Sequence, residues 1–250
     1  CSSATRIYAA GSGHDMLGLA STAQEVIALS NKTQPRVLYL GTATYDDASA
    51  MQEQTQQFVR LGCSVTTLEV AWQAPPPAEL EAAFAGTDIV LVSGGNTLFA
   101  VDRWVKLGVD SLMHTALSRG VVLSGGSAGF ISLCNGGHSD SMEPESFKNP
   151  PGPLFNASAA IKAKVDASWA YIRVPGVGAI NNLCCPHYDM IGSNGVHRES
   201  TRLVSTIGRR SSLMAITTML SLVLATLAPS LPTAPSPLIA RERPACGDSD

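Results

Sequence analysis

The feature that most constrains this chain is a buried strand at 121–124 that runs straight into a glycine-rich turn around a serine. Residues 125–129 read Gly-Gly-Ser-Ala-Gly, the G-x-S-x-G pattern, and a helix start of small residues follows. In a nucleophile elbow, a sharp strand-to-helix turn of this kind exposes a serine hydroxyl above the end of a parallel sheet. Glycine suits such a turn because a Cβ would crowd its backbone. The pattern predicts an α/β fold, and the motif alone leaves Ser127 as either a nucleophile or an ordinary turn serine.

A second strand ends in the same way earlier in the chain. Residues 88–93 form an apolar run that leads into Gly-Gly-Asn-Thr at 94–97, where a helix signal begins. Parallel strands finish on the same side of a sheet, so the two turns are expected to lie together. A serine that attacks a carbonyl needs two N–H donors for the oxyanion, and Ala128 and Gly95 are the candidates. The alternative is that this turn only starts a helix, capped by Asn96 or its neighbour.

His187 is the best-placed base among the five histidines. Pro186 precedes it, which favours an extended chain and ends a strand ladder there. A histidine at a strand end can take a proton from a serine. After Ser127, the carboxylates that could orient the imidazole are Asp140 and, as the alternative, Glu143. Each of them could equally be a solvated loop side chain.

Strand and helix signals alternate over the first half of the chain. The strand signals lie at 6–10, 36–40, 64–70, 88–93 and 120–124, and the helix signals at 20–29, 47–61, 77–84 and 97–104. This alternation predicts a mostly parallel sheet with helices on both faces.

The last part of the chain does not continue this alternation. Residues 211–228 carry no charge, and prolines dominate the stretch after them. A length of eighteen is at the lower limit for a membrane-spanning helix, but six of these residues are Ser or Thr, which argues against a membrane anchor. We expect a buried helix or hydrophobic segment followed by a disordered proline-rich end. The predicted division is an α/β domain over 1–205 and an atypical tail over 206–250.

Composition narrows the class of protein and its partners. With 250 residues and 45% hydrophobic content, the chain can bury a full core. A net charge of −3 gives no reason to expect nucleic acid or an anionic membrane surface as partner. Six cysteines without framework spacing favour free thiols in a reducing cytoplasm. Without H-E-x-x-H or paired C-x-x-C, we expect no metal and no other cofactor.

Four motifs taken together resemble a known family. They are the turn at 94–97, the G-x-S-x-G at 125–129, the region of Asp140, and Pro-His-Tyr-Asp at 186–189. In this order and spacing, over roughly residues 5–205, they are similar to the dipeptidase E (alpha-aspartyl dipeptidase) family of serine peptidases, a group that also contains cyanophycinase. The resemblance implies a flavodoxin-like three-layer α/β/α sandwich akin to the class I glutamine amidotransferases, with serine replacing their cysteine.

The resemblance also implies roles for the candidate residues. Ser127 would be the nucleophile, His187 the base, and Asp140 the acid with Glu143 as the alternative. Gly95 and Ala128 would form the oxyanion hole. The implied reaction is hydrolysis of dipeptides with an N-terminal aspartate, through an acyl-enzyme.

Arg198 and Asn96 are the expected substrate-binding residues. Arg198 is similar in position to the arginine that binds aspartate in family members, and an arginine fork matches a carboxylate with two parallel bonds. The alternative is an exposed helix face in which Arg198 forms i,i+3 or i,i+4 pairs.

Two other functions remain open from the sequence, a cyanophycinase-like β-aspartyl peptidase and an inert flavodoxin-like binding module. The expected partner is a small peptide, and both a monomer and a homodimer fit the sequence.

Overall fold

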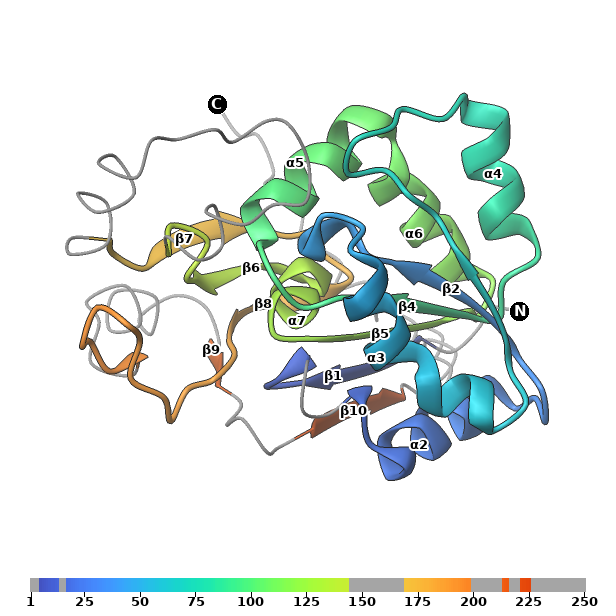
Figure 1. Ribbon diagram of the computed structural model, residues 1–250, viewed down its shortest axis with the longest axis horizontal. Helices are drawn as coiled ribbons and strands as arrows, with labels where there is room; N and C mark the ends of the chain where they lie inside the picture. Colours follow the sequence, from blue (N-terminus) through green and yellow to red (C-terminus); the bar gives the residue numbers. More distant parts are fainter. Residues whose placement is uncertain (1–4, 14–16, 144–168, 199–212, 216–220, 226–250) are drawn as a thin grey trace, which may run out of the picture.

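The alternating strands form one twisted, six-stranded sheet. The computed structural model describes residues 5–13, 17–143, 169–198, 213–215 and 221–225 (Figure 1). The sheet has the order β10-β1-β5-β4-β2-β3, in which β10 is antiparallel to β1 and the other neighbours are parallel. Its strands are β1 (Arg6–Ala10), β2 (Arg36–Leu40), β3 (Ser64–Thr67), β4 (Ile89–Val92), β5 (Val122–Gly126) and β10 (Ser221–Ala225).

Helices cover both faces of this sheet, because its strands are apolar on both sides. The helical elements are α2 (Ala20–Ser30), η1 (Thr42–Thr44), α3 (Ala48–Arg60), α4 (Pro77–Ala85), α5 (Thr97–Leu107), α6 (Val109–Ser118) and α7 (Ala128–Leu133). Helices α2 and α3 pack on one face, where Phe58 of α3 and Tyr39 of β2 belong to the same buried cluster. Helices α4 to α7 pack on the other, where Trp104 of α5 joins the cluster of Leu38 and Leu40. The expected three-layer α/β/α sandwich is therefore confirmed.

A second, four-stranded sheet extends the molecule beyond α7. Its order is β7-β6-β8-β9, with β6 parallel to β8 and antiparallel to β7. The strands are β6 (Cys134–Ser139), β7 (Ile172–Pro175), β8 (Ile180–Cys185) and β9 (Leu213–Ala215). Because β6 begins directly after α7, this sheet is joined by a short path to the G-x-S-x-G turn of the main sheet.

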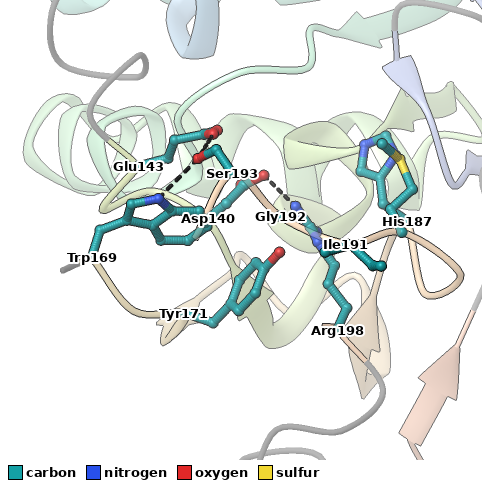
Figure 2. A pocket seen from close by; sticks show the side chains of 10 residues that line it. Asp140, Glu143, Trp169, Tyr171, His187, Ile191, Gly192, Ser193 and Arg198 are labelled. Carbon is teal, nitrogen blue, oxygen red and sulfur yellow. Dashed lines mark hydrogen bonds and ion pairs between the residues drawn. The ribbon is translucent and has the colours of Figure 1, made fainter. Parts of the chain in front are cut away.

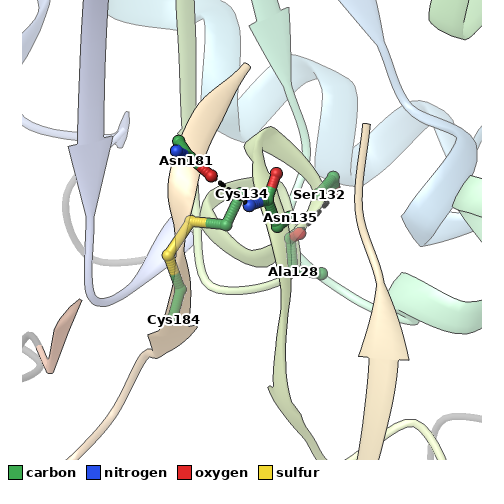
Figure 3. The surroundings of a disulfide bond; sticks show 6 residues. All are labelled: Ala128, Ser132, Cys134, Asn135, Asn181 and Cys184. Atoms are coloured by element: carbon green, nitrogen blue, oxygen red, sulfur yellow. Dashed lines mark hydrogen bonds between the residues drawn. A yellow bond between two sulfur atoms is a disulfide. The ribbon is translucent and has the colours of Figure 1, made fainter. Parts of the chain in front are cut away.

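A disulfide between Cys134 and Cys184 bridges β6 and β8 (Figure 3). The expectation of free thiols is wrong for this pair, because the parallel pairing of the two strands brings together cysteines that are 50 residues apart. Cys63 and Cys185 carry free, buried thiols. Disulfides persist in oxidising compartments, so the cysteines no longer argue for a reducing cytoplasm.

The uncharged segment near the end of the chain contains strands in its described parts. Residues 213–215 extend the second sheet and 221–225 pair with β1, so the helical alternative does not hold for either stretch. The proline-rich end lies outside the described residues. Of the helices in the described part of the chain, none combines the length and the apolar character needed to cross a bilayer.

Candidate active site

Glycine allows the backbone to pack tightly where β1, β4 and β5 end. A Cβ on Gly126 would lie 2.6 Å from the Cα of Gly13 and from the carbonyl oxygen of Ser12. A Cβ on Gly94 would lie 3.5 Å from the Cβ of Ser127. These short distances show that the glycine turn after β4 packs directly beside the serine, as the parallel strands predict.

Ser127 occupies the sharp turn between β5 and α7. Its φ of 54° and ψ of −114° fall in a backbone region that residues with a Cβ rarely adopt. Its N–H donates to the carbonyl of Ala10 at 3.1 Å, which fixes the turn to the end of β1. The strand, turn and helix thus have the arrangement of a nucleophile elbow.

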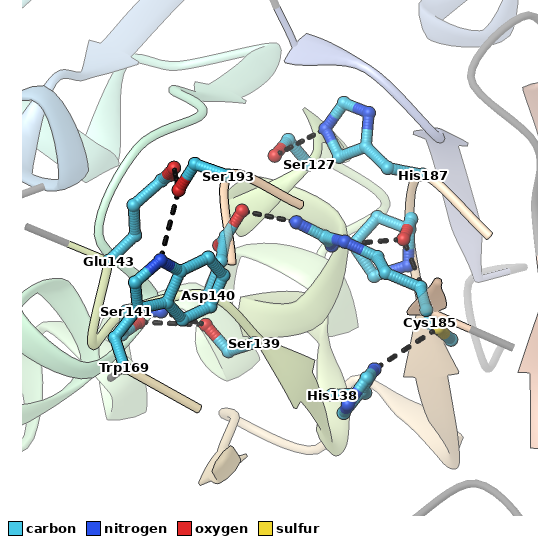
Figure 4. A network of polar contacts seen from close by, with 12 residues as sticks. Ser127, His138, Ser139, Asp140, Ser141, Glu143, Trp169, Cys185, His187 and Ser193 are labelled. Carbon is cyan, nitrogen blue, oxygen red and sulfur yellow. Dashed lines mark hydrogen bonds and ion pairs between the residues drawn. The ribbon is translucent and has the colours of Figure 1, made fainter. Parts of the chain in front are cut away.

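His187 approaches Ser127 from the second sheet. It comes after β8 with a φ of 49°, another left-handed backbone position, and its Nε2 lies 2.9 Å from the Oγ of Ser127 (Figure 4). This distance is within the range in which a histidine can accept the proton of a serine hydroxyl. The structure therefore brings together the two residues that the sequence pairs as nucleophile and base.

The two candidate oxyanion donors belong to the two turns that meet at the serine. Ala128 is the next residue, at the start of α7, and Gly95 belongs to the turn packed against the serine. Gly95 has a φ of +115°, and a Cβ there would lie 2.2 Å from the carbonyl oxygen of Ala43. Asn96 donates its N–H to the same oxygen at 2.8 Å, so this turn is held against η1.

Asn96 is 2% exposed, and protein groups engage both ends of its side-chain amide. The amide oxygen accepts from the N–H of Phe99 at 3.0 Å, and Nδ2 donates to the carbonyl of Ser141 at 3.2 Å. Ser141 Oγ in turn accepts from the N–H of Leu98 at 3.1 Å. Asn96 thus caps α5 and holds the loop after β6, where Asp140 and Glu143 lie.

Arg198 is buried beside the base loop, so the exposed helix face does not hold as its environment. It is 5% exposed and forms an ion pair with Asp140. Its Nη1 donates to the carbonyl of Pro186 at 3.1 Å, and its guanidinium carbon lies 4.9 Å from the centre of the Tyr171 ring. Burial lowers the pKa of Arg198, but the carboxylate of Asp140 and the hydroxyl of Tyr171 outweigh it, so the pKa is raised and the cation is stabilised.

A pocket of about 190 Å³ opens between these groups and His187 (Figure 2). Its far end is built by a chain of hydrogen bonds. The Nε1–H of Trp169 donates to Ser193 Oγ at 2.9 Å, and the Ser193 hydroxyl donates to Oε1 of Glu143 at 2.5 Å. Figure 2 shows Glu143 and Trp169 on the opposite side of the pocket from His187.

The two candidate acids make their contacts with other groups. Asp140 binds Arg198 and Glu143 accepts from Ser193, and neither of these contacts involves His187. The structure therefore joins the proposed nucleophile to its base and gathers both acids around the same pocket.

Sequence reasoning missed the aromatic and buried residues behind the pocket. Trp169 and Tyr171 pack edge to face and line it, and the only signal for them is a Trp-Ala-Tyr alternation before β7. His138 is 1% exposed, and its ring lies 4.6 Å from that of Tyr171. Burial, aided by the charge of Arg198, lowers the pKa of His138 to about 4. At neutral pH this imidazole is therefore uncharged and adds no positive charge beside Arg198.

Comparisons with known proteins identify the family of the chain. The family model described as peptidase family S51 matches residues 7–216. The uncharacterized peptidase YgaJ of Bacillus subtilis (strain 168) is 27% identical over 199 residues, which cover 79% of this chain and 84% of that protein.

Two solved structures are similar in fold. A putative peptidase E protein from Listeria monocytogenes EGD-e has a TM-score of 0.57 at 15% identity and covers 89% of this chain and 95% of its own. A peptidase from an acI-B1 Actinobacterium has a TM-score of 0.62 at 20% identity and covers 88% of this chain and 83% of its own. The family match spans the elbow, the base loop and Arg198, and it shows that the chain belongs to peptidase family S51.

Proposed function

We propose that this S51 peptidase hydrolyses dipeptides with an N-terminal aspartate, with Ser127 as nucleophile and His187 as base. The observation that carries the proposal is the 2.9 Å contact between Nε2 of His187 and Oγ of Ser127, made at a strained strand-to-helix turn. A buried arginine lies in the pocket beside that contact.

The mechanism derives from these positions. His187 accepts the hydroxyl proton as Ser127 Oγ attacks the peptide carbonyl, and the N–H groups of Ala128 and Gly95 bind the developing oxyanion. The imidazolium of His187 then gives its proton to the leaving amine. Water repeats the two steps on the acyl-enzyme and releases aspartate.

Asp140 is the acid that we propose, acting on the orientation of the base. Its partner Arg198 also donates to the carbonyl of Pro186, the residue before His187, so the ion pair restrains the backbone of the base loop. Glu143 remains the alternative acid.

Arg198 is the proposed binding group for the aspartyl side chain. Its guanidinium lines the pocket, where it contacts Asp140, the carbonyl of Pro186 and the hydroxyl of Tyr171. The five N–H donors of a guanidinium form a fork that matches a carboxylate. In this proposal Asn96 acts through Ser141, by holding the loop of Asp140 in place.

Release of aspartate from Asp-Leu tests the proposal. We expect Ser127→Ala and His187→Ala each to abolish release, while Ser111→Ala, an exposed serine on α6, retains it. Full activity in both site variants would contradict the assignment of Ser127 as nucleophile and His187 as base. A β-aspartyl dipeptide assayed in parallel distinguishes the cyanophycinase-like alternative, because that enzyme would cleave the β-linked substrate preferentially. An inert binding module would leave Ser127 unlabelled by a fluorophosphonate.

A further inference from the structure

One carboxylate of the pocket has no cationic partner among the residues described around it. The charged side chains that line the pocket are Asp140, Glu143 and Arg198. Asp140 and Arg198 form an ion pair, and His187 is uncharged when it acts as a base. Among the described lining residues, the charge of Glu143 is therefore left over, and the pocket has a net charge of −1.

Neutral donors hold Glu143 in one orientation. The Ser193 hydroxyl donates to its Oε1 at 2.5 Å, and the indole of Trp169 donates to the same hydroxyl oxygen. Trp169 is anchored through its carbonyl, which accepts from Nδ2 of Asn194 at 3.2 Å. These contacts fix the direction of the carboxylate, and none of the described residues that make them carries a positive charge (Figures 2 and 4).

The proposed substrate brings a matching pair of charges. With the scissile carbonyl at Ser127, the N-terminal residue enters the pocket and carries both a β-carboxylate and an α-ammonium. A volume of about 190 Å³ is small compared with the roughly 300–1,000 Å³ of pockets for drug-sized ligands, so it suits one small residue. Arg198 supplies the cation for the carboxylate, and Glu143 lies at the other end of the pocket.

We propose that Glu143 binds the α-ammonium of the substrate and so restricts the enzyme to peptides with a free amino terminus. This inference depends on the proposed function. A carboxylate–ammonium contact is a charge-assisted hydrogen bond, stronger than one between neutral groups. An acylated amine has no positive charge to offer and leaves the carboxylate of Glu143 uncompensated in the pocket. Glu143 is then a specificity residue, and orientation of His187 belongs to Asp140.

Two chromogenic substrates test this role, aspartyl p-nitroanilide and its N-acetyl derivative. We expect the wild-type enzyme to prefer the free amine strongly. Glu143→Gln, which keeps an oxygen for Ser193, should raise KM for the free-amine substrate about tenfold or more, with little change in kcat and little change for the acetylated substrate. Glu143→Asp should recover part of the preference. Glu79→Gln on α4 is the control and should leave both substrates unaffected.

The pH dependence of KM gives a second readout. The α-ammonium loses its charge near pH 8, so wild-type KM for the free-amine substrate should rise above that pH. This rise should be absent for the acetylated substrate and much reduced in Glu143→Gln. A triad acid would instead change kcat for both substrates equally.

The outcomes separate the two proposals. Equal wild-type cleavage of both anilides, or an equal loss of kcat for both in Glu143→Gln, overturns the role of Glu143 and leaves the peptidase standing. If the wild type cleaves neither anilide while a fluorophosphonate still labels Ser127, the aspartyl peptidase proposal is wrong and the inference falls with it. The wild-type comparison can overturn the inference even if the variants fail to fold.

Discussion

The two halves of the candidate site are built in different ways. The Ser127 half is held by backbone packing, with Gly126 against the turn after β1 and the serine N–H on the carbonyl of Ala10. The His187 half is held by side chains, through the disulfide of β6 and β8 and the buried contacts of Arg198. The backbone packing requires glycines at fixed positions in short motifs, whereas the side-chain contacts have no fixed spacing along the chain. The nucleophile can therefore be predicted from a short sequence motif, whereas the contacts around the base cannot.

The largest expected effect comes from the disulfide that holds the His187 half together. Cys134 comes directly after α7, which starts at the nucleophile, and Cys184 lies three residues before the base. Replacing both with alanine should lower the free energy of unfolding by about 2–4 kcal/mol. Chemical denaturation measures the loss. Cys63→Ala, at a free buried thiol, is the control, and an equal loss there would show that the bridge adds no stability of its own.

Gly126→Ala tests the backbone-built half. The added Cβ would lie 2.6 Å from two backbone atoms, so we expect a loss of about 2–3 kcal/mol in unfolding free energy and slower labelling of Ser127 by a fluorophosphonate. Gly108→Ala is the matched control, because Gly108 has a φ of +77° but no atom within 4 Å of the added Cβ. Equal losses in the two variants would contradict the packing argument.

Asp140→Asn tests the side-chain half. It leaves the buried Arg198 without its counter-charge, and because the Asp140 side chain is 25% exposed we expect a loss of only about 1–2 kcal/mol. Activity should fall while thermal unfolding stays cooperative. In a double-mutant cycle with Arg198→Gln the losses should be less than additive. Additive losses would mean that the ion pair does not couple Asp140 to the base loop.

Lowering the pH should reduce the free energy of unfolding through the same half, by less than Asp140→Asn does. The pKa of His138 is lowered from 6.5 to about 4, first by burial and then by the charge of Arg198, while Asp140 opposes the shift. The unfolded chain therefore binds a proton at higher pH than the folded protein does, and stability present above pH 6.5 is lost as the pH falls toward 4. Between pH 7 and pH 5.5 the loss should be about 1 kcal/mol. Unfolding curves at pH 7 and pH 5.5 measure it, and His138→Gln should show a smaller difference between them.

Much of the main sheet could be predicted because the sequence of each segment is enough to indicate the strand or helix that it forms. The bounds of β1 and β2 agree with the apolar runs at 6–10 and 36–40, and α4 begins at Pro77 as the proline at a helix start predicts. The elbow at Ser127 is equally local, because glycine, serine and glycine at fixed spacing describe one turn.

The second sheet could not be predicted, because its sequence lacks such signals. Strand β6 reads Cys-Asn-Gly-Gly-His-Ser and shows no apolar alternation. Its pairing with β8 also decides which cysteines bond, and spacing along the chain does not encode that. The burial of Arg198 likewise depends on Asp140 and Tyr171, which lie on other segments.

Strand β10 has a consequence for any shortened form of the protein. It covers the outer side of β1, from Arg6 opposite Ala225 to Ala10 opposite Ser221. A chain truncated before residue 221 would leave the hydrogen-bonding groups of β1 exposed at an open sheet edge, which invites self-association with a second molecule. Size-exclusion chromatography should then detect oligomers formed through the very strand that anchors the serine turn.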